Sequence, residues 1–226
     1  LVGEKPRKHN KGGFLMDQKY QYDDAKTEIF ARLRNSLSDH PTPPAVPREY
    51  RRVGERTGAE VVDVLIDRLE DYKANVYRED LDSLPERIGA LLEDRSCVIP
   101  SGLYEKWLPN RDFIWDLDDQ PLTISDLDSI DAVLTGSTVA CADTGTIFLS
   151  AQPNEGRRAI TLVPDHHVCV VFEKDVVDLV PQALEAIEST QPITMISGPS
   201  ATSDIELERV EGVHGPRRLD IIIVAT

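Results

Sequence analysis

Cysteine is scarce in this sequence of 226 residues, which contains only Cys97, Cys141 and Cys169. These three residues lie far apart and are odd in number, so the sequence has neither a disulfide framework nor a Cys-x-x-Cys motif for a metal or a cluster. We therefore expect a cytoplasmic protein with no cofactor and no iron–sulfur cluster on this chain.

Long apolar runs are also lacking, since no stretch approaches the roughly 20 residues that a transmembrane helix needs. Residues 1–13 are basic, but no apolar core follows them, so they do not resemble a signal peptide. Positive charge is in short supply, because 40 acidic residues oppose 25 basic ones and give a formal net charge of −15. Such a chain repels phosphate backbones. We expect no membrane span and no nucleic-acid partner.

Metal-binding motifs are missing as well. The adjacent histidines His166 and His167 lead into an apolar run that predicts a strand over residues 168–172. Neighbouring side chains on a strand point to opposite faces, so at most one histidine can reach a given site. Without a third ligand at suitable spacing, the sequence predicts no metal site.

What the sequence does contain divides into three parts. Residues 1–15 are expected to be a flexible N-terminal extension. Residues 16–50 hold a predicted helix, with apolar residues at helical spacing over residues 23–37, and a linker with four prolines that cannot continue a helix. Residues 51–226 are long enough for one α/β domain.

Helices and strands alternate within this domain. Apolar spacing predicts helices over residues 57–72, 84–92, 122–131 and 175–187, and strands over residues 75–78, 97–100, 159–163, 168–172 and 219–225. Two further strands within residues 132–149 flank a hairpin-like turn at residues 143–145. This alternation favours parallel pairing, so the predicted fold class is α/β with a parallel-rich sheet flanked by helices.

Residues 193–219 are the stretch where we expect the functional site. A short apolar run at residues 193–196 predicts a buried strand that breaks at Ser-Gly-Pro-Ser, and Ser203 with Glu206 fits a capping box that begins a helix. A turn at residues 212–216 precedes the last strand. Strand ends and a helix N-terminus would thus converge, which favours an anion-binding pocket.

Both turns in this stretch have a simpler interpretation, since Gly-Pro pairs often serve turns alone. The presence of Asp204, His214 and Arg217 beside them favours a site. The hairpin corner at residues 143–146 also has two interpretations. It is either a plain turn or a functional corner at which the Asp143 carboxylate and two threonine hydroxyls lie near backbone that a glycine allows to approach closely.

Three motifs together resemble the LUD-domain family, and within it the lactate utilisation protein C branch. They are Ser-Gly-Pro-Ser-x-Thr-x-Asp-Ile-Glu at residues 197–206 with Gly-Val-His-Gly-Pro at residues 212–216, Ala-Asp-Thr-Gly-Thr at residues 142–146, and Arg-Arg at residues 157–158 with Leu-Val-Pro-Asp-His-His at residues 162–167. The resemblance implies a NagB/RpiA/CoA-transferase-like fold. It also implies a three-part system that oxidises L-lactate to pyruvate, in which two partner proteins carry the iron–sulfur clusters.

The resemblance and the residue types together suggest roles at a site for a small anionic ligand. His214 is the expected proton acceptor, with Asp143 or Asp204 as its orienting group or a second acid. Arginine side chains and free amides suit a carboxylate such as lactate. The expected ligand-binding residues are Thr144, Gly145, Thr146, Arg157, Gly198, Pro199, Ser200, Thr202, Ser203, Gly215 and Arg217.

Two alternatives remain open at this point. The chain could be a stand-alone enzyme of the CoA-transferase or cyclo-ligase type, with Asp143 near the position of a catalytic Glu-x-Gly. However, Asp is one methylene shorter than Glu, and the glycine-rich motifs of those enzymes and of sugar-phosphate isomerases are missing. The chain could instead be a structural or regulatory subunit without catalysis, because fold analogy does not supply function.

Overall fold

The computed structural model describes residues 18–40, 42–202, 210–211 and 215–225, which fall into two compact units. The unit formed by residues 1–49 contains helix α1 (Gln18–Ser36) and the first part of the proline-rich linker. Apolar residues of α1, including Ile29, Phe30 and Leu33, are about half exposed. The unit formed by residues 50–226 contains all the other described helices and strands.

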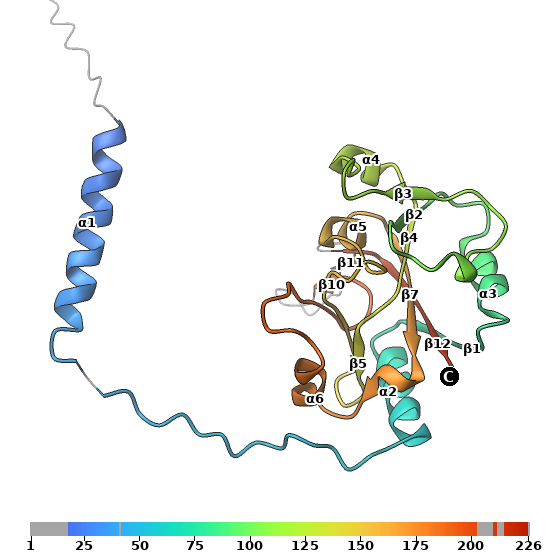
Figure 1. Ribbon diagram of the computed structural model, residues 1–226, viewed down its shortest axis with the longest axis horizontal. Coiled ribbons are helices and arrows are strands. Elements are labelled where there is room, and N and C mark those ends of the chain that lie inside the picture. Colours follow the sequence, from blue (N-terminus) through green and yellow to red (C-terminus); the bar gives the residue numbers. More distant parts are fainter. Residues whose placement is uncertain (1–17, 41, 203–209, 212–214, 226) are drawn as a thin grey trace, which may run out of the picture. The chain divides into compact units, whose positions relative to one another are not determined.

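A six-stranded parallel sheet forms the centre of this second unit (Figure 1). Its strand order is β1-β12-β7-β4-β2-β3. The strands are β1 (Asn75–Glu79), β2 (Cys97–Pro100), β3 (Ile114–Asp116), β4 (Ala132–Thr135), β7 (His166–Phe172) and β12 (Arg218–Val224). The predicted α/β class with a parallel sheet is confirmed, although the three-residue strand β3 had no clear pattern in the sequence.

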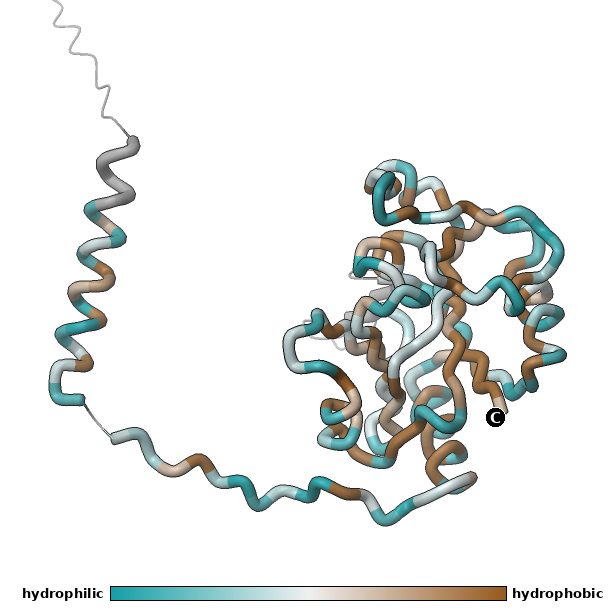
Figure 2. Tube along the Cα trace, viewed as in Figure 1, coloured by the Kyte–Doolittle hydropathy of each residue, from teal (hydrophilic) through white to brown (hydrophobic). Residues whose placement is uncertain are grey.

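Two helices cover opposite faces of this sheet, because successive residues of a strand face opposite ways. Helix α2 (Ala59–Asp71) buries Leu65 and Leu69 in the same cluster as Cys169 and Ile221. Helix α3 (Leu84–Leu92) joins the other face, in a cluster that holds Val168, Val170, Ile222 and Val224. Apolar residues accordingly follow the strands of the sheet in Figure 2.

A second sheet of four strands lies beside the first, in the order β8-β5-β6-β9. Its strands are β5 (Val139–Cys141), β6 (Thr146–Leu149), β8 (Val176–Val177) and β9 (Thr194–Ile196). Strands β5 and β6 are antiparallel, which confirms the predicted hairpin. Strand β9 exists as predicted, but the expectation of burial is wrong, because β9 is an edge strand and Met195 is 56% exposed.

The structure differs from the sequence prediction at residues 159–163 and 175–187. Residues 159–163, predicted as a strand, belong mainly to helix α5 (Arg158–Leu162), since a five-residue apolar run does not distinguish a buried strand from one buried helical turn. The single helix predicted over residues 175–187 is instead a 3-10 turn (Glu173–Asp175), strand β8 and helix α6 (Val180–Glu185). A proline in its first turn marks where α6 begins.

The remaining elements are short. They are a 3-10 turn (Glu105–Trp107), helix α4 (Ile124–Asp128), which starts with a capping box between Thr123 and Asp126, and the antiparallel pair β10 (Ala201–Thr202) and β11 (Val210–Glu211). The helix predicted from Ser203 lies largely outside the described residues, and its predicted last residues form β11 instead. Among the described helices, none has the length and apolar character needed to cross a membrane.

Candidate functional site

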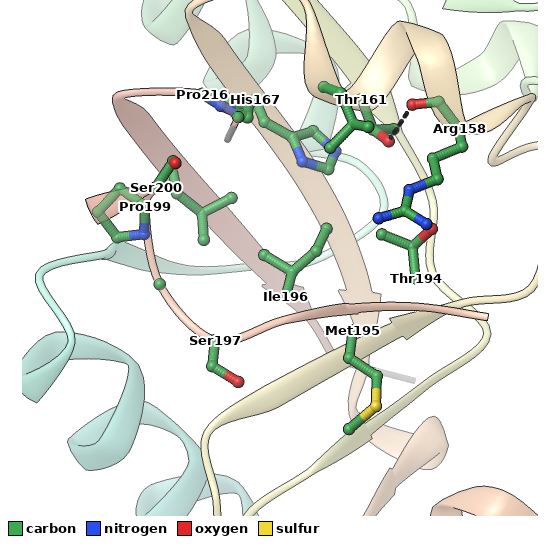
Figure 3. A pocket seen from close by; sticks show the side chains of 14 residues that line it. Arg158, Thr161, His167, Thr194, Met195, Ile196, Ser197, Pro199, Ser200 and Pro216 are labelled. Atoms are coloured by element: carbon green, nitrogen blue, oxygen red, sulfur yellow. Dashed lines mark hydrogen bonds between the residues drawn. The ribbon is translucent and has the colours of Figure 1, made fainter. Parts of the chain in front are cut away.

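A cavity of about 290 Å³ lies between helix α5, the segment that follows β9, and the amino ends of β7 and β12 (Figure 3). The sequence predicted the site within residues 193–219, where strand ends converge, and part of that stretch lines this cavity. Of the predicted ligand-binding residues, Gly198, Pro199, Ser200 and Gly215 line it. The other lining residues are Arg158, Thr161, Leu162, His167, Thr194, Met195, Ile196, Ser197, Pro216 and Leu219.

Residues from both predicted turns meet at this cavity, although residues 212–214 of the second turn lie outside the described part of the chain. The backbone N–H of Ser200 donates to the carbonyl oxygen of Pro216 at 2.8 Å, which joins the turn after β9 to the turn before β12. Gly198 has a φ of 85°, and a Cβ there would lie 2.7 Å from both Cβ and the carbonyl oxygen of Tyr72. Only glycine fits this position, so the first turn approaches α2 closely.

Arg158, the first residue of α5, places its side chain at this cavity beside Thr194 (Figure 3). Its carbonyl oxygen accepts a hydrogen bond from the Thr161 hydroxyl at 3.0 Å, which fixes the first turn of the helix. No carboxylate among the described residues pairs with the Arg158 guanidinium, and the residue is exposed. It is therefore a cation available to a ligand.

His167 forms part of the wall of the cavity and is almost fully buried. Its Nε2 atom lies 2.8 Å from the hydroxyl oxygen of Thr135, which is itself buried. Burial, and secondly the neighbouring His166, lower the pKa of His167 from 6.5 to about 3. The imidazole is therefore neutral at physiological pH and offers a hydrogen bond without a charge.

A row of three hydroxyl groups leads from the hairpin corner to the cavity. The hydroxyl oxygens of Thr144 and Thr146 are 2.8 Å apart, and Thr146 is again 2.8 Å from the hydroxyl oxygen of Ser197, which lines the cavity. Thr144 and Thr146 were predicted as ligand-binding residues. The structure connects them to the cavity through Ser197 instead of placing them in its lining.

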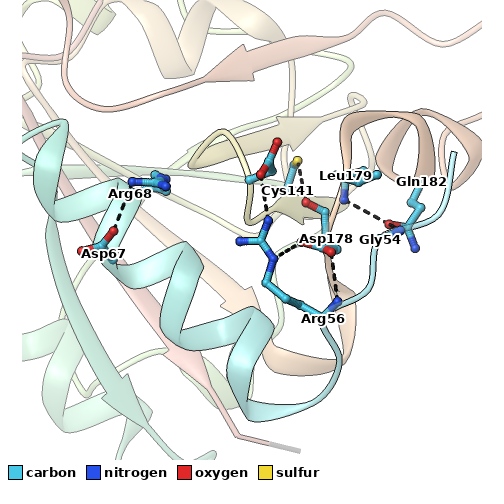
Figure 4. Close-up of polar contacts among 9 residues, drawn as sticks. Gly54, Arg56, Asp67, Arg68, Cys141, Asp178, Leu179 and Gln182 are labelled. Carbon is cyan, nitrogen blue, oxygen red and sulfur yellow. Dashed lines mark hydrogen bonds and ion pairs between the residues drawn. The ribbon is translucent and has the colours of Figure 1, made fainter. Parts of the chain in front are cut away.

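Asp143 lies outside the cavity lining, in an ion pair with Arg56 at 2.8 Å. Arg56 also contacts Asp178, with 2.9 Å between Nε and Oδ1 (Figure 4). The hydrogen bond to Asp143 raises the pKa of Arg56 above its ordinary value. Asp143 therefore fastens the segment before α2 to the hairpin corner, where Gly145 takes a φ of 57° and completes the turn.

The two arginines of the predicted site lie elsewhere. Arg157 donates to both carboxylate oxygens of Asp116, at 2.7 and 2.8 Å, and to the carbonyl oxygen of Leu122. Arg217 forms an exposed ion pair with Asp165 at 3.4 Å. Neither side chain lines the cavity that contains Arg158.

Three predicted site residues, Ser203, Asp204 and His214, lie outside the described residues, and Thr202 is described only as part of β10. Their roles stay predictions. The sequence analysis did not assign Arg158, Thr161 and His167 to the site. The Arg-Arg and His-His pairs were visible signals, but choosing the correct member of each pair requires the start of α5 and the direction of β7.

Within the described part of the chain, no group of three His, Cys, Asp or Glu side chains could hold a metal ion. All three cysteines are buried and unpaired. Burial raises the pKa of Cys97 and of Cys169 to about 12, so both remain protonated thiols.

Known proteins resemble this chain over most of its length. The LUD domain family model matches residues 62–224. Lactate utilization protein C of Deinococcus radiodurans is 41% identical over 207 residues, which cover 89% of this chain and 96% of that protein. The Bacillus subtilis protein of the same name is 31% identical over 119 residues, 49% of each chain. The crystal structure of a DUF162 family protein from Deinococcus radiodurans has 36% identity and a TM-score of 0.63, and the match covers 74% of this chain and 97% of that one.

Proposed function

Because this chain belongs to the LUD-domain family, we propose that it is a component of a system that oxidises L-lactate to pyruvate. We further propose that it binds a small carboxylate in the cavity beside Arg158. The names of its relatives support the first part. The second part rests on one observation: the Arg158 guanidinium, which no carboxylate of the described residues engages, lies at a small cavity lined by hydroxyl groups.

The lining suits a monoanion of a few heavy atoms. A guanidinium binds a carboxylate through two parallel N–H···O bonds, and among the described lining residues Arg158 is the one that carries a charge. The hydroxyls of Thr161, Thr194, Ser197 and Ser200 lie around the same space. A single positive charge surrounded by neutral hydrogen-bonding groups matches one carboxylate better than a polyanion.

The second functional group of lactate, its 2-hydroxyl, also has counterparts in this cavity. Ser197 ends the hydroxyl row, and a hydroxyl can either donate or accept a hydrogen bond. The neutral imidazole of His167 offers either a donor or an acceptor nitrogen, depending on its tautomer. The same cavity could therefore receive the hydroxyl of lactate or the ketone oxygen of pyruvate.

In this proposal the electrons leave lactate through two iron–sulfur partner proteins, in the cytoplasm. Iron–sulfur clusters are held by cysteine thiolates. Cys97 and Cys169 are buried protonated thiols on separate strands, which supports assigning the clusters to partners. Three unpaired thiols also suit a reducing compartment. A CoA-transferase-like activity would need the Asp143 carboxylate as the reacting group. Asp143 is instead engaged in an ion pair with Arg56, which argues against this alternative function.

We expect Arg158→Ala to weaken lactate and pyruvate binding by about 10- to 100-fold, the range for losing a charge-assisted hydrogen-bonding group. Isothermal titration of the full chain with each acid measures this change. Arg158→Lys should fall between the wild type and alanine, because lysine keeps the charge and loses the planar fork.

The matched control is Arg78→Ala, at an exposed arginine of β1 that pairs with Asp63. It should leave both affinities unchanged. Equal affinities of the wild type and Arg158→Ala for both acids would rule out this cavity as the carboxylate site.

A further inference from the structure

A buried histidine–aspartate pair lies on the other face of the sheet from His167. The Nε2 atom of His166 is 2.7 Å from Oδ2 of Asp220, and both side chains are at most 4% exposed. Asp220 also accepts a hydrogen bond from Asn75 at 2.6 Å and forms an ion pair with Arg218 at 2.7 Å. Three neighbouring strands, β1, β12 and β7, thus contribute to one polar cluster.

Two members of this cluster, His166 and Arg218, line a second cavity of about 410 Å³. His167 and Leu219 line the carboxylate cavity, whereas His166 and Arg218 line this one. The two cavities therefore lie on opposite faces of the sheet, at the amino ends of β7 and β12, because adjacent residues of a strand point to opposite faces.

Three arginines from two parts of the chain converge on the second cavity. Arg217 and Arg218 stand at the start of β12, and Arg95 comes from the loop before β2. The guanidinium of Arg111 donates to the carbonyl oxygens of Glu93 and Arg95, which holds that loop in place. The arginine charges are thus gathered on a chain whose net charge is −15.

Four carboxylates of the described residues lie near these arginines and engage them unequally. The buried Asp220 pairs with Arg218. This leaves Arg95 and Arg217 as the more available charges. Asp131 accepts hydrogen bonds from the N–H and hydroxyl of Ser96, at 2.9 and 2.6 Å. Asp165 pairs with Arg217 across 3.4 Å, with both side chains about 60% exposed, which makes a weak and replaceable contact. Asp128 lies on the exposed rim.

Arg95 is the least satisfied of the three cations. Within the described residues its guanidinium forms no ion pair. It lies 3.5 Å from Nδ1 of His166 and interacts with the charge of Asp131 at longer range. A guanidinium only donates, so Nδ1 accepts, and Nε2 carries the hydrogen that Asp220 receives. The hydrogen bond to Asp220 thus fixes the orientation of the His166 imidazole in the cavity wall, next to the Arg95 guanidinium.

We propose that this second cavity binds a phosphate group, as inorganic phosphate or as a phosphomonoester. Several guanidinium groups around a mainly polar space suit a tetrahedral dianion, whereas a monocarboxylate needs only one. This site is separate from the carboxylate cavity and uses none of its lining residues. The proposal does not depend on the lactate role.

Isothermal titration of the full chain with inorganic phosphate and with glycerol 3-phosphate tests this proposal. Both should bind, and Arg95→Ala should weaken binding by about tenfold or more. Arg217→Ala should also weaken phosphate binding. Because Arg217 is exposed and lies outside the loop that holds Arg95, this variant tests the cavity without disturbing that loop. Equal affinities for the two probes would indicate free phosphate as the ligand, and tighter binding of the ester would indicate an organic phosphate.

Arg158→Ala provides the control that separates the two cavities, because it should leave phosphate binding unchanged while weakening lactate binding. Failure of both probes to bind would overturn the proposal. Unchanged phosphate affinity in both Arg95→Ala and Arg217→Ala would also overturn it, as would loss of phosphate binding in Arg158→Ala.

Discussion

Replacing Asp220 with alanine is expected to lower the free energy of unfolding by about 3–5 kcal/mol, the range for removing one partner of a buried ionic cluster. Asp220 is fully buried, and its removal leaves His166, Asn75 and Arg218 without their shared acceptor. Urea unfolding at pH 7 measures the change. The effect should be large because three strands of the central sheet lose a common polar contact.

The pKa of Asp220 indicates the pH range in which this contribution operates. Burial alone would raise it, but hydrogen bonds from His166, Asn75 and Arg218 outweigh burial and hold it below its usual value. The stabilisation is therefore present above about pH 4 and is lost as the pH falls through the folded-state pKa. Asp165→Ala, at an exposed carboxylate, should cost less than about 1 kcal/mol. Similar losses in the two variants would contradict the buried-cluster interpretation.

His167 should make stability depend on pH in a different range. Its pKa is about 3 in the folded protein and about 6.5 when unfolded, so the unfolded chain binds a proton that the folded chain excludes. Its contribution is complete above pH 6.5 and declines by up to about 1.4 kcal/mol per pH unit below that value. Urea unfolding of the wild type and of His167→Asn between pH 7 and pH 5 isolates this slope.

The quantity to compare is the change in unfolding free energy with pH in the wild type and in His167→Asn, because all other groups titrate in both proteins. The wild type should lose stability faster than His167→Asn as the pH falls. His40→Asn, in the exposed segment before the proline-rich linker, should follow the wild type. Parallel curves for the wild type and His167→Asn would mean that His167 protonates freely in the folded protein.

Periodic stretches of the sequence were sufficient to predict much of the domain. Helices α2 and α3 and strands β1, β2, β7 and β12 appear close to their predicted bounds, because their apolar spacing matches one buried face or a buried strand. Short elements were harder to predict. The run at residues 159–163 has the composition of a strand but forms most of α5, whose Ile160 is buried in one cluster with Val98 of β2 and Val133 of β4.

The candidate site was predictable only in outline. Glycine and proline mark the stretches after β9 and before β12 in the sequence, and described residues of both stretches line the cavity. The sequence does not show which charged residue reaches the cavity, because adjacent arginines are equivalent in a sequence. Arg157 precedes α5 and turns to Asp116, whereas Arg158 begins the helix and reaches the cavity. Similarly, the pairing of Asp143 with Arg56 joins residues 87 positions apart, which no local pattern reveals.

Lactate-dependent reduction of an electron acceptor tests the proposed role most directly. The assay compares this chain alone, the two iron–sulfur partner proteins of our proposal alone, and the complete mixture. The arms that contain this chain are run with the wild type, Arg158→Ala and Arg78→Ala. We predict reduction only in the complete mixture, with a marked loss in Arg158→Ala and none in Arg78→Ala. Full reduction by the partners without this chain, or by the mixture containing Arg158→Ala, would contradict a carboxylate-binding role in lactate oxidation.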